Sequence, residues 1–227
     1  MTSIFRHALG ADFDRLHPRM QQRFGFSSED SVACVGTGTM DEIWRGRAFT
    51  LPFLYLGATR NILFPERGTD IPFVIQNFAY RDGYGRETVT FVRSFELPNG
   101  RARRFDATMI FSASRSRIVD YLGTRQHLAV DLDMQVDCRG GLRVTSGRQQ
   151  FSEGLLGFRV PAALSGTATL HEWYDETHER FRIEVSVTND RFGRLFGYRG
   201  SFTVDFRECE PDDVPMAVRP VRECRRE

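Results

Sequence analysis

From residue 72 onward, hydrophobic and polar residues alternate along several stretches of the chain. In the stretch 128–136 every second residue is Leu, Val or Met, and Asp131 and Asp133 stand between them. Successive side chains of a β-strand point to opposite faces of a sheet, so this pattern predicts strands with one buried and one wet face. The same alternation occurs over residues 105–112, 181–188 and 201–206.

Short turn sequences separate the alternating stretches. They are Asp82-Gly83, Pro98-Asn99-Gly100, Gly140-Gly141 and Asp175-Glu176. Strands that follow one another this closely pair as antiparallel hairpins. A sheet of about eight to ten such strands twists and curls instead of staying flat. We therefore expect a large curved antiparallel sheet, closed into a barrel or left as a half-barrel.

Helices are expected in the N-terminal part of the chain. Residues 4–9 carry one apolar stripe, and Pro18 stands where another helix would begin. A first strand is expected over residues 31–40. Residues 41–63 are ambiguous, but they fit a short helix packed across the sheet with Pro52 in its first turn.

The predicted fold class is therefore α+β. We expect a single domain over residues 1–206, in which a few N-terminal helices accompany the curved antiparallel sheet. The last segment, residues 207–227, contains three prolines and many charges without a hydrophobic period. We expect it to be a mobile C-terminal tail.

Composition and charge exclude several kinds of chemistry. The 227 residues have a formal net charge of +1, without the excess of positive charge that is typical of nucleic-acid-binding domains. All 31 basic residues are arginine, so no lysine is present to form a Schiff base or to complete a phosphate-binding loop. The four cysteines form no CxxC pair, which argues against a zinc or redox motif. We expect no metal, no cofactor and no nucleic-acid partner.

Two histidine–glutamate pairs invite a metal interpretation, but their spacing does not support it. His171-Glu172 and His178-Glu179 lack the two histidines four residues apart that place both rings on one face of a zinc-binding helix. Both pairs flank the turn between two predicted strands. We interpret them as residues of a solvated hairpin.

No stretch of the sequence predicts stable insertion into a membrane. The longest apolar stretch, AFTLPFLYLGA, has eleven residues and contains a proline, whereas a spanning helix needs about twenty residues. The N-terminal residues carry charges throughout and lack the apolar core of a signal peptide. We expect a cytoplasmic protein with reduced thiols.

The phase of the strands places an arginine among aromatic residues. In the stretch 87–95, Arg93 shares one face with Phe91 and Phe95, and Glu87 lies at the end of that face. The face is otherwise apolar, so these four residues are candidates for a ligand-binding surface.

Two further strands direct polar residues to the same side. In the hairpin 167–188, the expected register places Glu172 opposite Phe181 on the apolar face. In the last strand, Tyr198 is in phase with Phe202. Phe181 joins the candidate ligand-binding residues, and Glu172 and Tyr198 are candidates for catalysis.

An unpaired charge among aromatic side chains is very costly, so Arg93 needs a carboxylate partner. We expect Arg93 and Glu172 to come within hydrogen-bonding distance, with Tyr198 on the same face. This cluster has two interpretations. It is either a buried ion pair that fixes the register of the strands, or a polar anchor at the bottom of a largely apolar ligand cavity.

Several motifs resemble a known bacterial family. They are the N-terminal FRxxLGxDFDRLxP segment, Arg93-Ser94-Phe95, Phe158-Arg159-Val160-Pro161 and Gly193-Arg194-Leu195-Phe196-Gly197-Tyr198-Arg199-Gly200. Over most of residues 4–206 the chain is similar to a domain-of-unknown-function family found beside YndJ-type membrane proteins and attached to saccharopine-dehydrogenase-like oxidoreductase domains. It departs from that family at Phe91, where a tryptophan is expected, and around Phe24, where a histidine is missing. The resemblance implies a domain assignment and no particular activity.

Three classes of function remain open from the sequence. The leading hypothesis is a module that binds a small hydrophobic molecule, lipid-like or polyketide-like, with Arg93 meeting its polar group. The alternative is a cofactor-independent isomerase, cyclase or hydrolase in which Glu172 is the general base and Tyr198 or Arg93 polarises a carbonyl. The third is a protein-interaction domain that uses a sheet edge or the acidic strand face at Asp131, Asp133 and Asp137.

Overall fold

Eleven antiparallel strands make up most of the computed structural model, which describes residues 2–153, 156–159 and 166–225. In chain order the strands are β1 Val32–Arg45, β2 Gly68–Arg81, β3 Glu87–Glu96, β4 Ala102–Ser112, β5 Arg117–Leu122, β6 Leu128–Val136, β7 Leu142–Glu153, β8 Leu156–Arg159, β9 Thr167–Asp175, β10 Arg180–Asn189 and β11 Gly193–Glu208. Short helices complete the fold. They are α1 Ile4–Leu9, η1 Gly10–Arg15, α2 Pro18–Phe24, η2 Ala48–Thr50, α3 Leu51–Ala58 and η3 Pro211–Asp213.

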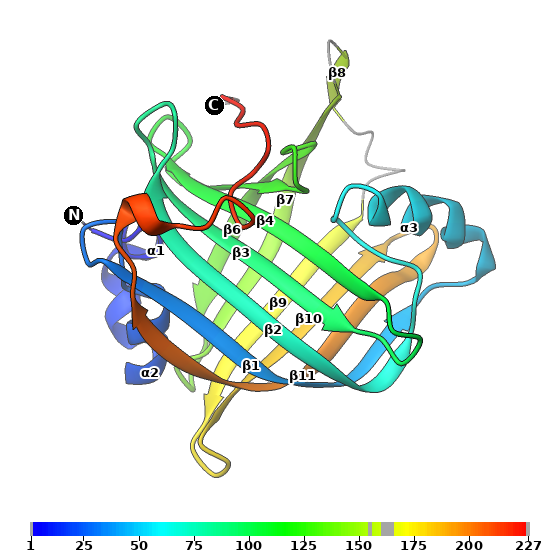
Figure 1. The fold of residues 1–227 in the computed structure, drawn as a ribbon, viewed down its shortest axis with the longest axis horizontal. Helices are drawn as coiled ribbons and strands as arrows, with labels where there is room; N and C mark the ends of the chain where they lie inside the picture. Colours follow the sequence, from blue (N-terminus) through cyan, green and yellow to red (C-terminus); the bar gives the residue numbers. More distant parts are fainter. Residues whose placement is uncertain (1, 154–155, 160–165, 226–227) are drawn as a thin grey trace.

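The strands close into a ten-stranded barrel (Figure 1). From β1 to β6 each strand pairs with its successor, while β1 also pairs with β11, which continues through β10 and β9 to β7. Pairing of β6 with β7 completes the circle, and β8 extends from the end of β7. The expected α+β domain with a curved antiparallel sheet is thus confirmed, in its fully closed form.

The N-terminal helices fill one end of the barrel. Their inward side chains are buried in the same core as the strands and include Ile4, Phe5, Phe13, Leu16, Met20 and Phe24. The backbone N–H of His17 donates to the carbonyl of Gly140 in the β6–β7 turn at 3.0 Å, which ties the start of α2 to the barrel wall. Pro18 occupies the first turn of α2 as predicted.

Helix α3 lies at the opposite end of the barrel. It begins with Pro52 in its first turn, as expected, but it covers only the middle of residues 41–63, because β1 continues to Arg45 beyond the expected strand end at residue 40. Leu54 is 2% exposed and joins the core, and Phe64 in the following loop packs on Phe95 at a ring distance of 5.1 Å. None of the helices in the described part of the chain has the length and apolar composition that crossing a bilayer requires.

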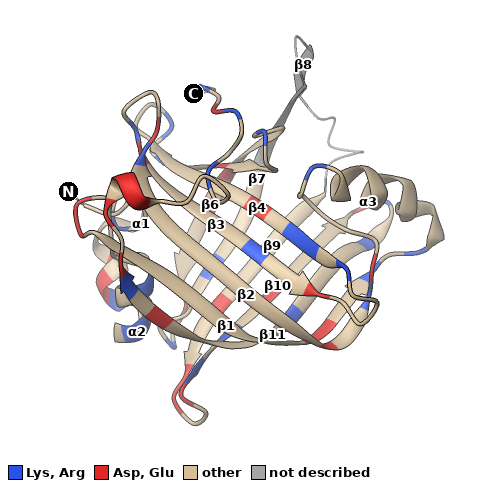
Figure 2. Cartoon of the chain, viewed as in Figure 1, with Lys and Arg blue, Asp and Glu red and all other residues tan. Residues whose placement is uncertain are grey.

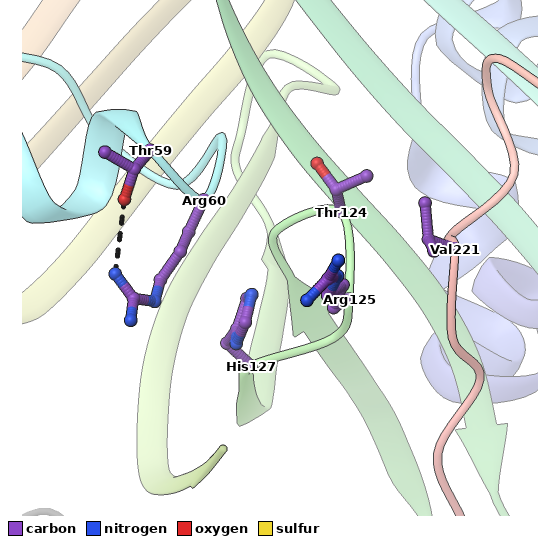
Figure 3. A pocket seen from close by; sticks show the side chains of 6 residues that line it. All are labelled: Thr59, Arg60, Thr124, Arg125, His127 and Val221. Carbon is purple, nitrogen blue, oxygen red and sulfur yellow. Dashed lines mark hydrogen bonds between the residues drawn. The ribbon is translucent and has the colours of Figure 1, made fainter. Parts of the chain in front are cut away.

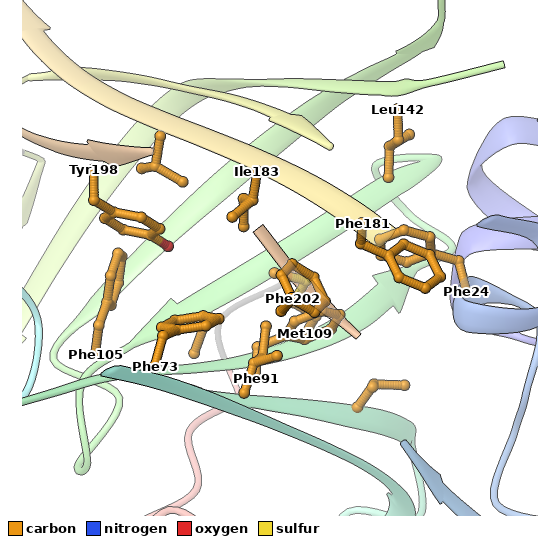
Figure 4. Close-up of a cluster of buried hydrophobic side chains, with 14 of the residues drawn as sticks. Phe24, Phe73, Phe91, Phe105, Met109, Leu142, Phe181, Ile183, Tyr198 and Phe202 are labelled. Carbon is orange, nitrogen blue, oxygen red and sulfur yellow. The ribbon is translucent and has the colours of Figure 1, made fainter. Parts of the chain in front are cut away.

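Aromatic side chains fill much of the barrel interior (Figure 4). Phe181 stacks on Phe202 with ring centroids 5.5 Å apart, and Phe202 contacts Phe73 at 5.8 Å. Gly36 of β1 makes room for them, because a Cβ there would lie 2.6 Å from Ile75 and 2.8 Å from the Phe202 ring. These contacts run along one wall of the barrel, from β10 over β11 and β1 to β2, and therefore hold these neighbouring strands together.

The register of the β9–β10 hairpin differs from the expected one by two residues. Glu172 stands opposite Ile183, and Phe181 stands opposite Tyr174. A shift of two residues preserves the face on which each side chain lies, because side chains alternate with a period of two. Glu172 and Phe181 therefore still point inward.

The segment after β11 lies along the outer face of the barrel instead of extending away from it as a mobile tail. Val214 and Val218 are buried against Phe78 and Tyr80, and Cys224 packs on the outer side of β5 and β6. The backbone N–H of Cys224 donates to Gln126 Oε1 at 2.6 Å. Tail and wall together thus form a second, outer layer of packing.

The two faces of β6 provide a direct test of which side chains point into the barrel. Leu132 is 8% exposed in the core, whereas the Asp133 side chain is 60% exposed and pairs with Arg117 at 3.1 Å. We predict that Leu132→Asp lowers the free energy of unfolding by about 3 kcal/mol or more, because neither solvent nor a cation reaches its carboxylate. Asp133→Ala should change it by about 0.5 kcal/mol or less. If urea denaturation showed equal losses of unfolding free energy for the two variants, the assignment of Leu132 to the inner face and Asp133 to the outer face of β6 would be wrong.

Candidate functional site

A buried ion pair joins helix α2 to the barrel wall. Arg23 Nε donates a hydrogen bond to Glu172 Oε1, and the two residues are 2% and 1% exposed. Arg23 Nη1 also donates to Asn77 Oδ1 at 2.8 Å and to Cys34 Sγ at 3.3 Å. Helix α2, β9, β2 and β1 therefore meet at a single guanidinium.

The electrostatics of this group favour the charged pair. Burial alone would lower the pKa of Arg23, but the neighbouring Glu172 carboxylate outweighs it and raises that pKa. Burial raises the pKa of the Cys34 thiol, although Arg23 opposes this shift. The guanidinium also lies 5.0 Å from the centre of the Phe202 ring, an additional cation–π contact.

The expected pairing of Arg93 with Glu172 is wrong, because Arg23 occupies the carboxylate. The strand phases alone do not reveal this partner, because Arg23 belongs to a helix, where it comes three residues after Met20 on the inward face of α2. Residues three apart on a helix lie on one side. That spacing was the available signal.

Arg93 instead lies in a second interior group with Asp120 and Tyr198. The three residues are 3%, 7% and 0% exposed and come from β3, β5 and β11. The Arg93 guanidinium lies 5.0 Å from the ring centre of Phe105 and 5.5 Å from that of Phe91. Arg93 is thus held among aromatic rings on the inner side of the sheet.

Burial dominates the acid–base properties of this second group. It raises the pKa of Asp120 to about 7, with Arg93 acting in the opposite direction. It also raises the pKa of Tyr198 to about 12, where Arg93 opposes the shift and Glu172 adds to it. Near neutral pH the phenol is therefore a hydrogen-bond donor, and the carboxyl is close to its titration midpoint.

Several polar atoms of the barrel interior lack a hydrogen-bond partner within the described residues. They are Arg23 Nη2, Arg93 Nε, Asp120 Oδ1 and the Tyr198 hydroxyl. Leaving a buried donor or acceptor unpaired costs about 1–3 kcal/mol each, so native proteins avoid it outside sites that engage water or a ligand. These atoms mark the interior as a candidate binding site, and Asp120 is a member that sequence reasoning missed. The sequence indicates the inward position of Asp120, because Asp120 stands two residues after Ile118 and two before Leu122 and so lies on the same face of the strand as these apolar residues.

The remaining predicted site residues divide into two groups. Phe91, Phe95 and Phe181 are all less than 5% exposed and belong to the interior cluster, close to the polar groups. Glu87 is engaged elsewhere, because its two carboxylate oxygens accept hydrogen bonds from the N–H and hydroxyl of Ser28, both at 2.6 Å. Glu87 therefore fixes the loop after α2 to β3.

Two surface features affect the alternatives left open by the sequence. Asp131 on the supposedly acidic face of β6 is 6% exposed and pairs with Arg115 at 2.6 Å, so that face is partly neutralised. His171 stacks on Trp173 and bonds Asp137 at 2.8 Å, as a hairpin residue. In the described ranges no cluster of three or more His, Cys, Asp or Glu side chains is arranged to hold a metal ion.

A pocket of about 450 Å³ opens on the outer side near the end of α3 (Figure 3). It is lined by Thr59, Arg60, Thr124, Arg125, His127 and Val221. Thr124 is fixed by a hydrogen bond from Asn61 Nδ2 at 2.7 Å. The lining supplies hydrogen-bond donors from two arginines, a histidine and two threonine hydroxyl groups, a combination that can bind an anion. The pocket is therefore a second candidate site, separate from the barrel interior.

The geometry defines a closed antiparallel β-barrel protein with charged residues in an aromatic interior. The chain belongs to the family described as domain of unknown function (DUF4166), whose model matches residues 16–202. It is 35% identical over 210 residues to the uncharacterized protein YndH of Bacillus subtilis (strain 168), covering 92% of this chain and 100% of that protein. No solved structure matches the chain.

The Arg23–Glu172 pair yields a mutational prediction. Arg23→Met leaves the Glu172 carboxylate buried without its cation and should lower the free energy of unfolding by about 3–5 kcal/mol. Adding Glu172→Gln should recover much of this loss, because no charge is then stranded. Arg93→Met is the matched control and should cost less, since Arg93 holds no hydrogen-bonded carboxylate. A double variant no more stable than Arg23→Met would contradict the pairing.

Asp120 yields a prediction on pH. Its pKa is about 7 in the folded protein and near 3.8 when unfolded. Between these values only the unfolded state releases the proton, so stability contributed by this group falls as pH rises from 4 to about 7. As the pH rises from 4 to 8, the free energy of unfolding of Asp120→Asn should therefore increase relative to that of the wild type by on the order of 2–4 kcal/mol. Urea denaturation at both pH values measures the difference, with Asp133→Asn as control. A pH-independent difference would contradict the shift.

Proposed function

We propose that the barrel binds a small, largely apolar molecule in its interior, with an anionic or carbonyl group of that molecule meeting Arg93. The observation that carries this proposal is the buried Arg93 Nε, which has no acceptor among the described residues although it lies in an apolar interior. A guanidinium presents its donors in a planar fork that suits a carboxylate. The Tyr198 hydroxyl would supply a further donor to the same group.

The surrounding side chains suit the apolar part of such a ligand. Phe91 and Phe105 flank the Arg93 guanidinium, and Phe95 packs on Tyr198 at a ring distance of 5.1 Å. Some barrels of about eight strands hold one small ligand in their interior, and the diameter of a barrel grows with the number of its strands. The ten strands of this barrel therefore favour an interior site. The location that we propose for this receptor is the cytoplasm.

A second candidate function is cofactor-independent isomerase, cyclase or hydrolase chemistry, and one observation favours it. Glu172 is a poor general base here because Arg23 holds its carboxylate as an ion pair. Asp120 is the better candidate, since a pKa of about 7 suits proton transfer at neutral pH. In this version Tyr198, with its raised pKa, would donate a hydrogen bond to a substrate carbonyl.

Ligand-induced stabilisation tests the binding proposal. We predict that at least one long-chain or aromatic carboxylate raises the melting temperature by roughly 5–10 °C at about 100 times its Kd. The alcohol of the same chain should bind at least about tenfold more weakly, because it lacks the charge that meets Arg93. Titration calorimetry with both compounds measures this ratio.

Variants distinguish the interior site from nonspecific adsorption. Arg93→Met should remove the preference for the carboxylate over the alcohol, while Arg101→Met, at an exposed position, should retain it. If both variants keep the preference, the carboxylate binds elsewhere and the proposal is wrong. Turnover of a bound carbonyl compound that is lost in Asp120→Asn would favour the enzymatic alternative.

A further inference from the structure

Exposed hydrophobic side chains gather at the α3 end of the barrel. Of the eight large hydrophobic side chains that are exposed in the described residues, five lie there. Phe53 is 70% exposed and Tyr55 58%. We call this surface the α3 patch, and its members are Phe49, Phe53, Tyr55, Leu56 and Phe192.

The α3 patch is continuous although two chain segments contribute to it. The rings of Phe49 and Phe192 lie 5.5 Å apart, and the backbone N–H of Gly46 donates to the carbonyl of Leu195 at 2.9 Å. Leu54 anchors the opposite side of α3 in the core. The exposed side chains therefore project outward from a fixed support.

Arginines outnumber acidic residues in the two chain segments that carry the α3 patch. Residues 43–65 contain three arginines and no acidic residue, and the segment 190–195 adds two arginines and one aspartate. Figure 2 shows arginines in the segments that flank α3. In the sequence, the arginines of the ranges 43–65 and 190–195 are Arg45, Arg47, Arg60, Arg191 and Arg194.

We propose that the α3 patch docks the protein peripherally on an anionic lipid bilayer. An eight-residue helix is about 12 Å long, less than half the apolar thickness of a bilayer, so α3 would lie in the interface and not cross it. Aromatic and leucine side chains beside arginines are the combination that binds such interfaces. A second copy fits less well, because a two-fold interface would bring the same arginines against each other.

Sedimentation with lipid vesicles tests this proposal. The full chain should bind vesicles made of equal parts phosphatidylcholine and phosphatidylglycerol. It should bind vesicles of phosphatidylcholine alone at least about tenfold more weakly, because each arginine near an anionic surface raises the partition coefficient about fivefold. Rising salt should weaken the binding. Equal binding to both vesicle types, or binding to neither, would overturn the proposal.

Matched variants locate the contact. Phe53→Ser should reduce the partition coefficient about tenfold, whereas Tyr84→Ser, equally an exposed aromatic but in the β2–β3 turn at the other end, should leave it unchanged. Arg47→Gln should reduce it about fivefold, with Arg139→Gln in the β6–β7 turn as control. Equal losses in both members of a pair would refute the α3 patch as the docking surface. Concentration-dependent dimers lost in Phe53→Ser would assign the patch to a second copy and also refute the proposal.

Discussion

A charged side chain inside a closed apolar barrel needs a compensating group, and this constraint organises the interior. At the α2 end, Arg23 and Glu172 compensate each other and so connect a helix to the barrel wall. Farther along, Arg93 has Asp120 nearby without a hydrogen bond between them, and burial keeps the Asp120 pKa near 7. One arginine thus completes the fold, while the other retains a donor that a ligand would satisfy.

The strand phases were predictable because a period of two depends on burial alone. Arg93, Phe95 and Tyr198 lie inside as expected, and even a hairpin register wrong by two residues left Glu172 on the correct face. The partner of Glu172 was not predictable from strands, because it belongs to a helix whose position depends on how the barrel closes. Helix spacing indicated an inward Arg23, but no local pattern identifies which carboxylate it meets.

The two ends of the barrel differ in what their helices bury. At one end, the α2 ion pair and the rings of Phe5 and Phe24 seal the interior. At the other, α3 is held by Leu54 and turns Phe53, Tyr55 and Leu56 outward. The C-terminal segment adds a layer outside the wall, which its charge and proline content did not indicate, because the prolines among its valines prevent a regular helix or strand.

The most direct measurement is a crystal structure of the protein with the carboxylate that stabilises it most strongly. We expect the carboxylate within hydrogen-bonding distance of the Arg93 guanidinium and the Tyr198 hydroxyl, and the apolar chain against Phe91 and Phe95. The Arg23–Glu172 pair should be unchanged. A carboxylate bound outside the barrel, with Arg93 hydrogen-bonded directly to Asp120, would contradict an interior binding site.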